Sequence, residues 1–158
     1  MKNLQFVLIA GLLVALDQVS KALVLKYIPL HHSIAVIPGL FNLTHVQNPG
    51  GAFGFLAGNS GPWRHWIFLG AALVALVLIL YFHQQTPKDK PWMRLALAMI
   101  FGGAVGNLID RVRFGSVVDF MDFYSGLLHW PAFNVADCGV TIGVTIFVLH
   151  IVFKKTPF

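Results

Sequence analysis

The feature that most constrains this chain of 158 residues is a set of four apolar stretches, each about 20 residues long. About 20 mostly apolar residues are what an α-helix needs to cross the hydrocarbon core of a bilayer. We predict helices over approximately residues 4–25, 63–82, 92–111 and 133–153, joined by outer loops 26–62 and 112–132. The pattern predicts an all-α membrane protein, a four-helix transmembrane bundle forming a single integral membrane domain over residues 1–158.

The composition supports this class. Apolar residues make up 57% of the chain and charged residues only 11%, against about 25% charged in a typical soluble domain. A soluble enzyme and a disordered tail are excluded, and Cys138 is the only cysteine, so no intrachain disulfide scaffold is available. Because the eleven basic residues are scattered, we expect no nucleic-acid partner.

The first apolar stretch has one alternative interpretation, a cleaved secretory signal, because Lys2 precedes it. However, no small-x-small cleavage site follows Ala15, and Asp17 and Lys21 interrupt the run. We therefore expect a retained helix.

The basic residues predict the orientation. Six lie in short segments at one set of helix ends: Lys2, Lys88, Lys90, Arg94, Lys154 and Lys155. Four are spread over the two long loops at the other ends: Lys26, Arg64, Arg111 and Arg113. Because short cytoplasmic segments are rich in Lys and Arg, we place both termini in the cytoplasm and the two long loops outside.

The first outer loop contains strand-forming residues. Apolar, β-branched and aromatic side chains over 34–47 precede a turn at Asn48–Gly51, and AFGFL follows at 52–56. These predict a small extramembrane β-sheet on the outer face. The second outer loop is aromatic enough to rest in the membrane interface.

Polar residues gather where the outer ends of the helices meet. They are Asp17, Lys21, Arg64, His65, Asn107, Asp110, Arg111, Asn134 and Asp137, with Asp119 just beyond. Ionisable groups within membrane spans are costly and are candidates for a functional site. Asp17 and Lys21 share a helix face. Gly102, Gly103 and Gly106 predict close approach of another helix.

Several chemistries are disfavoured. The seven histidines form no H-x-x-x-H pair, so we expect no metal and no cofactor. Ser20 and Lys21 point in different directions on a helix. A pairing of Cys138 with His129 is the weaker alternative, because a lone membrane cysteine is usually an apolar filler.

Asp119 and Asp137 are the better candidates. Two close carboxyls in a poorly solvated site do not both ionise easily, so one keeps a proton. The ionised carboxylate takes a proton from water, and the protonated carboxyl hydrogen-bonds the carbonyl under attack. The alternative from spacing alone is that these two residues cap helices or pair with Arg111 and Arg113.

At these positions the sequence resembles the lipoprotein signal peptidases, also called signal peptidase II. The matching motifs are D-Q-V-S-K (17–21), N-P-G-G-A-F (48–53), G-N-L-I-D-R (106–111), V-V-D-F (117–120) and F-N-V-A-D (133–137). They occur in the family's order and cover most of the chain. Two small departures are Gly51 and Cys138, where the family commonly has other small residues.

The resemblance implies an aspartic endopeptidase of the bacterial inner membrane with its active site near the outer, periplasmic face. It implies diacylglyceryl-modified prolipoprotein as substrate, cut just before the lipidated cysteine, with globomycin-type inhibitors and membrane lipid as further partners. Asp119 and Asp137 would be the catalytic pair. The supporting residues would be Asp17, Lys21, Asn48, Asn107, Arg111 and Asn134. We expect a monomer.

Two other function classes are alternatives to a peptidase. In a proton-coupled carrier, Asp17, Lys21 and Arg111 would line a path, but the inner halves of the helices lack polar residues and no inverted repeat is evident. A non-enzymatic binder would hold a lipoprotein precursor without turnover. Incubation of the purified protein with a lipidated precursor separates these classes.

Overall fold

The computed structural model describes residues 2–51 and 63–154. The four predicted helices are present: α1 (Lys2–Tyr27), α2 (Trp63–Gln85), α3 (Pro91–Phe114) and α4 (Val135–Lys154). Each is long and apolar enough to cross a membrane. The largest differences from prediction are at Gln85 and Phe114, where the helices continue beyond the predicted ends at 82 and 111.

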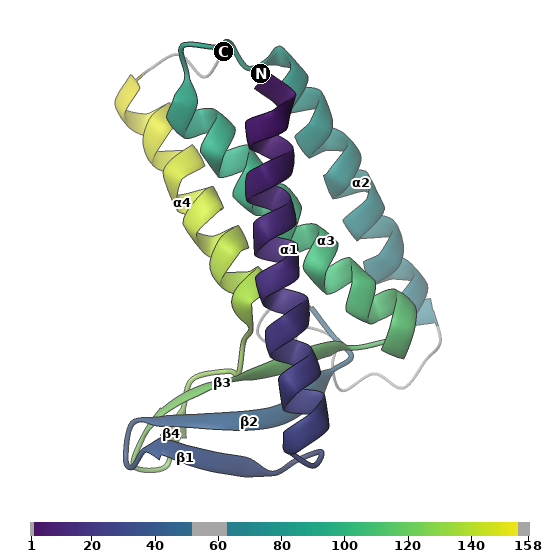
Figure 1. Cartoon of the computed structure of the whole chain (residues 1–158), viewed down its shortest axis with the longest axis vertical. Helices are drawn as coiled ribbons and strands as arrows, with labels where there is room; N and C mark the ends of the chain where they lie inside the picture. The colour runs from purple at the N-terminus through teal and green to yellow at the C-terminus, as the bar shows by residue number, and fades with distance from the viewer. Residues whose placement is uncertain (1, 52–62, 155–158) are drawn as a thin grey trace.

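Helix α3 is the centre of the bundle and contacts α1, α2 and α4 (Figure 1). A Cβ atom at Gly102 would lie 2.9 Å from the carbonyl oxygen of Ala10 in α1, and one at Gly106 would lie 3.2 Å from the Cβ of Ala136 in α4. These positions tolerate only glycine at the present helix spacing. The predicted close approach is confirmed, and it involves two helices.

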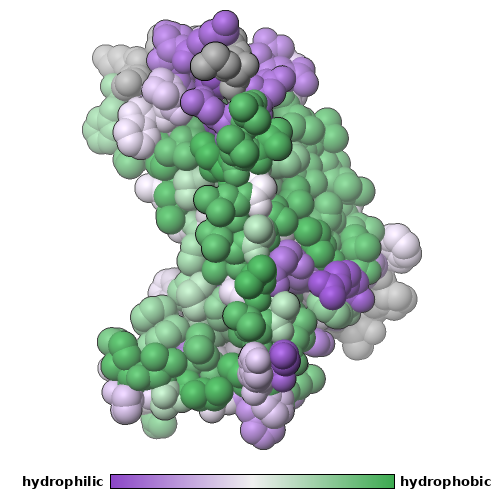
Figure 2. All heavy atoms as spheres, viewed as in Figure 1, coloured by the Kyte–Doolittle hydropathy of each residue, from purple (hydrophilic) through white to green (hydrophobic). Residues whose placement is uncertain are grey.

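The outside of the bundle is apolar. Figure 2 shows hydrophobic side chains over most of the viewed helix surface, with hydrophilic residues gathered at the end away from the sheet and near the junction with the sheet. Leu12, Val74 and Val77 are among the largely exposed apolar residues. A surface of this kind suits contact with lipid acyl chains and not with water.

A four-stranded antiparallel sheet lies at the end of the bundle opposite the N-terminal end of α1 (Figure 1). Its order is β1 (Ser33–Ile37), β2 (Phe41–Asn48), β3 (Val117–Ser125) and β4 (Leu128–His129). Val118 and Phe120 of β3 pack against Val24 in the last part of α1 and Ile28 just after it. The predicted sheet is confirmed, and this packing fixes it to the bundle.

The strands and turns of the first outer loop differ in part from the prediction. A turn around Gly39, at φ +82°, divides the predicted strand-forming stretch into β1 and β2. The chain turns again at Asn48–Gly51, after β2, as predicted. The predicted continuation at 52–56 lies outside the described residues.

The second outer loop, predicted over 112–132, contains the strands β3 and β4, which were not predicted. Residues 117–120 are all buried, so their backbone groups require partners. Pairing with β2 supplies part of them, and the N–H of Phe120 donates to the carbonyl oxygen of Phe133.

The glycines of α3 generate a stability prediction. We expect Gly103→Ala to lower the free energy of unfolding by about 1–3 kcal/mol, because the new methyl group would meet the carbonyl oxygen of Ala136 and the side chain of Val140. Gly70→Ala is the matched control, since nothing lies within 4 Å of its Cβ position. Thermal unfolding in detergent measures both. Equal melting temperatures would contradict the packing described here.

Candidate active site

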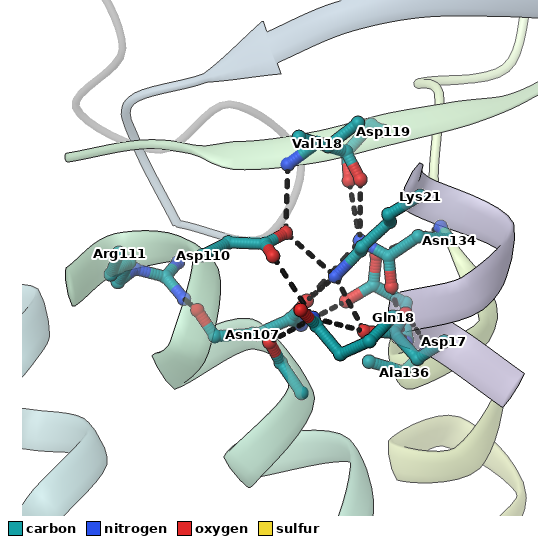
Figure 3. Close-up of polar contacts among 12 residues, drawn as sticks. Asp17, Gln18, Lys21, Asn107, Asp110, Arg111, Val118, Asp119, Asn134 and Ala136 are labelled. Carbon is teal, nitrogen blue, oxygen red and sulfur yellow. Dashed lines mark hydrogen bonds and ion pairs between the residues drawn. The ribbon is translucent and has the colours of Figure 1, made fainter. Parts of the chain in front are cut away.

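A buried lysine lies at the centre of the polar network near the sheet. Lys21 Nζ is 2.8 Å from Asp17 Oδ2 in the same helix and 2.8 Å from Asp110 Oδ2 in α3 (Figure 3). All three side chains are at most 2% exposed. Gln18 donates to Asp17 and to Asp110 from the same face of α1. Such burial is tolerated because every charge has an opposite charge or a donor beside it.

The two carboxylates of this network also hold the backbone of the elements that follow. Asp110 accepts a hydrogen bond of 3.1 Å from the N–H of Val118, in β3. Asp17 accepts one of 2.9 Å from the N–H of Ala136, in the first turn of α4. Asp119 and Asp137 each follow these anchored residues directly. The ion cluster therefore positions two other aspartates.

Asn134 joins those two aspartates. The N–H of Asp137 donates to Asn134 Oδ1 at 2.9 Å, and the N–H of Asn134 donates to Asp137 Oδ2 at 3.2 Å. This reciprocal pair is a capping box at the start of α4. The amide of Asn134 donates to Asp119 Oδ1 at 2.7 Å. One asparagine thus contacts both carboxyl-bearing residues.

Asn107 holds the second carboxyl. Its Nδ2 donates to Asp137 Oδ1 at 2.8 Å, while its oxygen accepts from Lys21 Nζ at 3.0 Å and from Asn134 Nδ2 at 3.2 Å. Two donors on the oxygen decide which end of the amide faces the carboxylate. Lys21 therefore fixes the orientation of the Asn107 amide, and through it the donor that Asp137 receives.

The turn after β2 holds the other side of Asp119. Asn48 donates to Asp119 Oδ2 at 3.1 Å and accepts from the N–H of Gly50 at 2.9 Å. Arg111 donates to the carbonyl oxygens of Gly50 and of Asn107. Its guanidinium connects the turn to α3.

Asp119 and Asp137 line one cavity of about 600 Å³, together with Asn48, Asn107 and Arg111. Most of the remaining lining is apolar and comes from residues 130–133 and the first turns of α4. Burial, and after it the negative charge of Asp137, together raise the pKa of Asp119 to about 7, against the hydrogen bonds from Asn48 and Asn134 that lower it. The cavity therefore holds two carboxyls, one of which readily carries a proton.

Comparison with known proteins decides the family. The model of the family described as signal peptidase (SPase) II matches residues 9–153. The chain belongs to the signal peptidase II family. It is thus a peptidase that acts on the signal peptides of prolipoproteins. The family resemblance seen in the sequence is confirmed.

Individual relatives agree with this assignment. The chain is 53% identical to a lipoprotein signal peptidase of Desulforapulum autotrophicum, covering 95% of this chain and 93% of that protein. It is 45% identical to one of Syntrophus aciditrophicus, over 95% and 93%. A solved bacterial membrane enzyme superposes with a TM-score of 0.80 at 33% identity, covering 98% of this chain and 93% of the other.

The structure brings the residues singled out in this signal peptidase II sequence together in two layers. Asn48, Asn107, Arg111, Asp119 and Asp137 line the cavity. Asp17 and Lys21 lie buried behind it, and Asn134 connects the layers. Asn134 lies just before α4 and caps it, instead of lying within its first turn.

The weaker candidates have other contacts. The hydroxyl of Ser20 donates to the carbonyl oxygen of Asp17, and His129 Nδ1 lies 2.8 Å from Asp122 Oδ1 in the sheet. Cys138 lines the cavity beside Asp137. Within residues 2–51 and 63–154, no three His, Cys, Asp or Glu side chains are grouped as metal ligands would be.

Two contributors were missed by sequence reasoning. Gln18 and the carboxylate of Asp110 complete the ion cluster, yet neither was assigned a supporting role. A signal was available, because any polar residue that shares a depth with other polar groups in an apolar span needs a partner there.

The ion cluster generates a stability prediction. Lys21→Met leaves the carboxylates of Asp17 and Asp110 buried without a counter-charge, so we expect the free energy of unfolding to fall by about 3–5 kcal/mol. Lys26→Met, five residues later on the exposed surface of α1, should change it by less than about 0.5 kcal/mol. Denaturation in mixed micelles compares them. Equal effects would show that the buried ion cluster has no special structural role.

Proposed function

We propose that this member of the signal peptidase II family is an aspartic endopeptidase that cuts diacylglyceryl-modified prolipoproteins just before the lipidated cysteine. Asp119 and Asp137 would share one water molecule as the nucleophile. The observation that carries the proposal is that both carboxyls line one cavity and both are held by Asn134. The side-chain donors to the two carboxyls are neutral asparagine amides, and a neutral donor favours ionisation less than a cation does. One carboxyl can therefore keep the proton that the reaction uses.

The two carboxyls would take different roles. Asp137 lies in the first turn of α4, where the helix dipole favours negative charge. It would accept a proton from the water as the water oxygen attacks the scissile carbonyl carbon. Asp119, with its raised pKa, would hold the proton that hydrogen-bonds the developing oxyanion. The proton on Asp137 then passes to the leaving nitrogen as the C–N bond breaks.

The remaining residues would orient the peptide. The segment around a scissile bond must be extended to reach both carboxyls, and its freed amide groups then need partners inside the membrane. Arg111 and Asn48 present donors on the cavity wall. Val140 and Ile142 of α4 offer an apolar surface for the acyl chains or the signal peptide helix.

We further propose that the enzyme is a monomer of the bacterial inner membrane with the sheet on the periplasmic side. Support comes from Lys88, Lys90 and Arg94, which lie in or beside the short α2–α3 connection at the end opposite the sheet. The cavity then lies near the outer interface, where the lipidated cysteine of a precursor lies. Globomycin-type inhibitors would occupy the same cavity.

Substitution of the aspartates tests the mechanism. We expect Asp119→Asn and Asp137→Asn each to reduce cleavage of a lipidated precursor at least about 10³-fold, while melting temperature and inhibitor binding persist. Asp89→Asn, at the opposite end of the bundle, should cleave normally. A gel-shift assay with purified components reads the turnover. Wild-type-like cleavage by either active-site variant would overturn the aspartic mechanism, and no turnover by the wild type would favour the binder alternative.

The raised pKa of Asp119 predicts a pH profile. Below about pH 7 its carboxyl carries the required proton, and above it that proton is lost, so kcat/KM should fall as the pH rises through about 7. The hydrogen bond from Asn48 lowers this pKa, so Asn48→Ala should move the alkaline limb to higher pH. Initial rates measured from about pH 5.5 to about pH 9, a range that spans the pKa of Asp119 near 7, give both profiles. A limb that is absent or that moves to lower pH would contradict the assignment.

A further inference from the structure

A second cavity, of about 390 Å³, lies at the end of the bundle remote from the sheet. It is formed by the first turns of α1, the end of α2, the α2–α3 connection and the start of α3. Neither carboxyl of the active site is near it, and the peptidase mechanism does not use it. Its lining divides into an apolar part and a cationic part.

The apolar part has a buried floor and an exposed edge. Phe6 is 6% exposed, and its ring lies 4.0 Å from the ring of His83, measured between centroids. Phe6 also belongs to the core cluster with Met93 and Leu97, so the floor is rigid. Leu8, which lines the same cavity, is 59% exposed on the outer surface of α1. The cavity therefore opens towards the side of the bundle that faces acyl chains.

The cationic part is supplied by Lys88 in the connection and Arg94 in α3. No carboxylate lines this cavity among the described residues, and Asp89, beside Lys88, is not part of the lining. The start of α3 at Pro91 adds the positive end of a helix dipole to the same region. The local potential favours an anion at a depth where α-helices leave the membrane.

We propose that this cavity binds the headgroup of an anionic phospholipid. The phosphate would lie between Lys88 and Arg94, and an acyl chain would cover Leu8 and the wall behind it. Basic pockets between transmembrane helices are known physical sites for such headgroups. The apolar wall distinguishes this ligand from a free phosphate, which gains nothing from contact with Leu8. The proposal does not depend on the catalytic mechanism.

Lipid titration of the purified protein tests the proposal, with binding followed by native mass spectrometry. The probes are dioleoylphosphatidylglycerol and, as the neutral comparison, dioleoylphosphatidylcholine. We expect selective binding of the anionic lipid. Each basic side chain near a membrane surface is worth about fivefold in binding, so Lys88→Ala/Arg94→Gln should weaken it about 30-fold. The matched double variant Lys26→Ala/Arg113→Gln removes the same charge at the other end and should bind within twofold.

A single variant keeps the test decisive if the Arg94 change disturbs folding. Lys88 is exposed, so Lys88→Glu should fold normally and weaken binding at least about fivefold, with Lys26→Glu as its control. Equal loss in the variant and its control would show attraction by net charge only and overturn the site. Equal binding of the neutral lipid, or displacement of the anionic lipid by an equal concentration of inorganic phosphate, would overturn it as well.

Discussion

The buried contact of Lys21 with Asp17 and Asp110 is the constraint on which the rest of the site depends. Charges removed from water are stable only when partners surround them, so this cluster accepts few arrangements of its three side chains. Each carboxylate uses its remaining capacity on a backbone N–H, of Ala136 and of Val118. The elements α1, α3, β3 and α4 are thereby fixed to one another, and the positions of Asp119 and Asp137 follow from that arrangement.

Asparagine amides, and not charged side chains, donate hydrogen bonds to Asp119 and Asp137. A lysine or arginine paired directly with either carboxyl would favour ionisation of both. Asparagine donors orient the oxygens with a much weaker bias, so burial and mutual repulsion can keep one proton on the pair. The cation Lys21 does not contact Asp137 directly; it donates to Asn107, which in turn donates to Asp137. The ion cluster of Lys21, Asp17 and Asp110 therefore positions the two carboxyls, while the asparagine amides leave their protonation to burial and mutual repulsion.

The sequence was informative where one physical effect dominates. Apolar length predicted four helices, and the cost of polar groups in lipid predicted that polar residues at the outer helix ends would gather. Those of α1, α3 and α4 do so, whereas Arg64 and His65 of α2 do not line the cavity. Strand register was not predictable, because β2 and β3 are about 70 residues apart and no local turn fixes how they pair. Strand β3 within the aromatic second loop was not predicted, because the pairing with β2 that forms it is a contact distant in the sequence.

Asn134 performs two tasks with one side chain. Its oxygen begins α4 and its nitrogen holds Asp119, so fraying of a single helical turn displaces Asp137 and at the same time removes one hydrogen bond from Asp119. Local opening of this kind costs less than unfolding the bundle. Heat should consequently inactivate the enzyme before it melts the protein, and a ligand that tightens the cavity would raise the first transition more than the second.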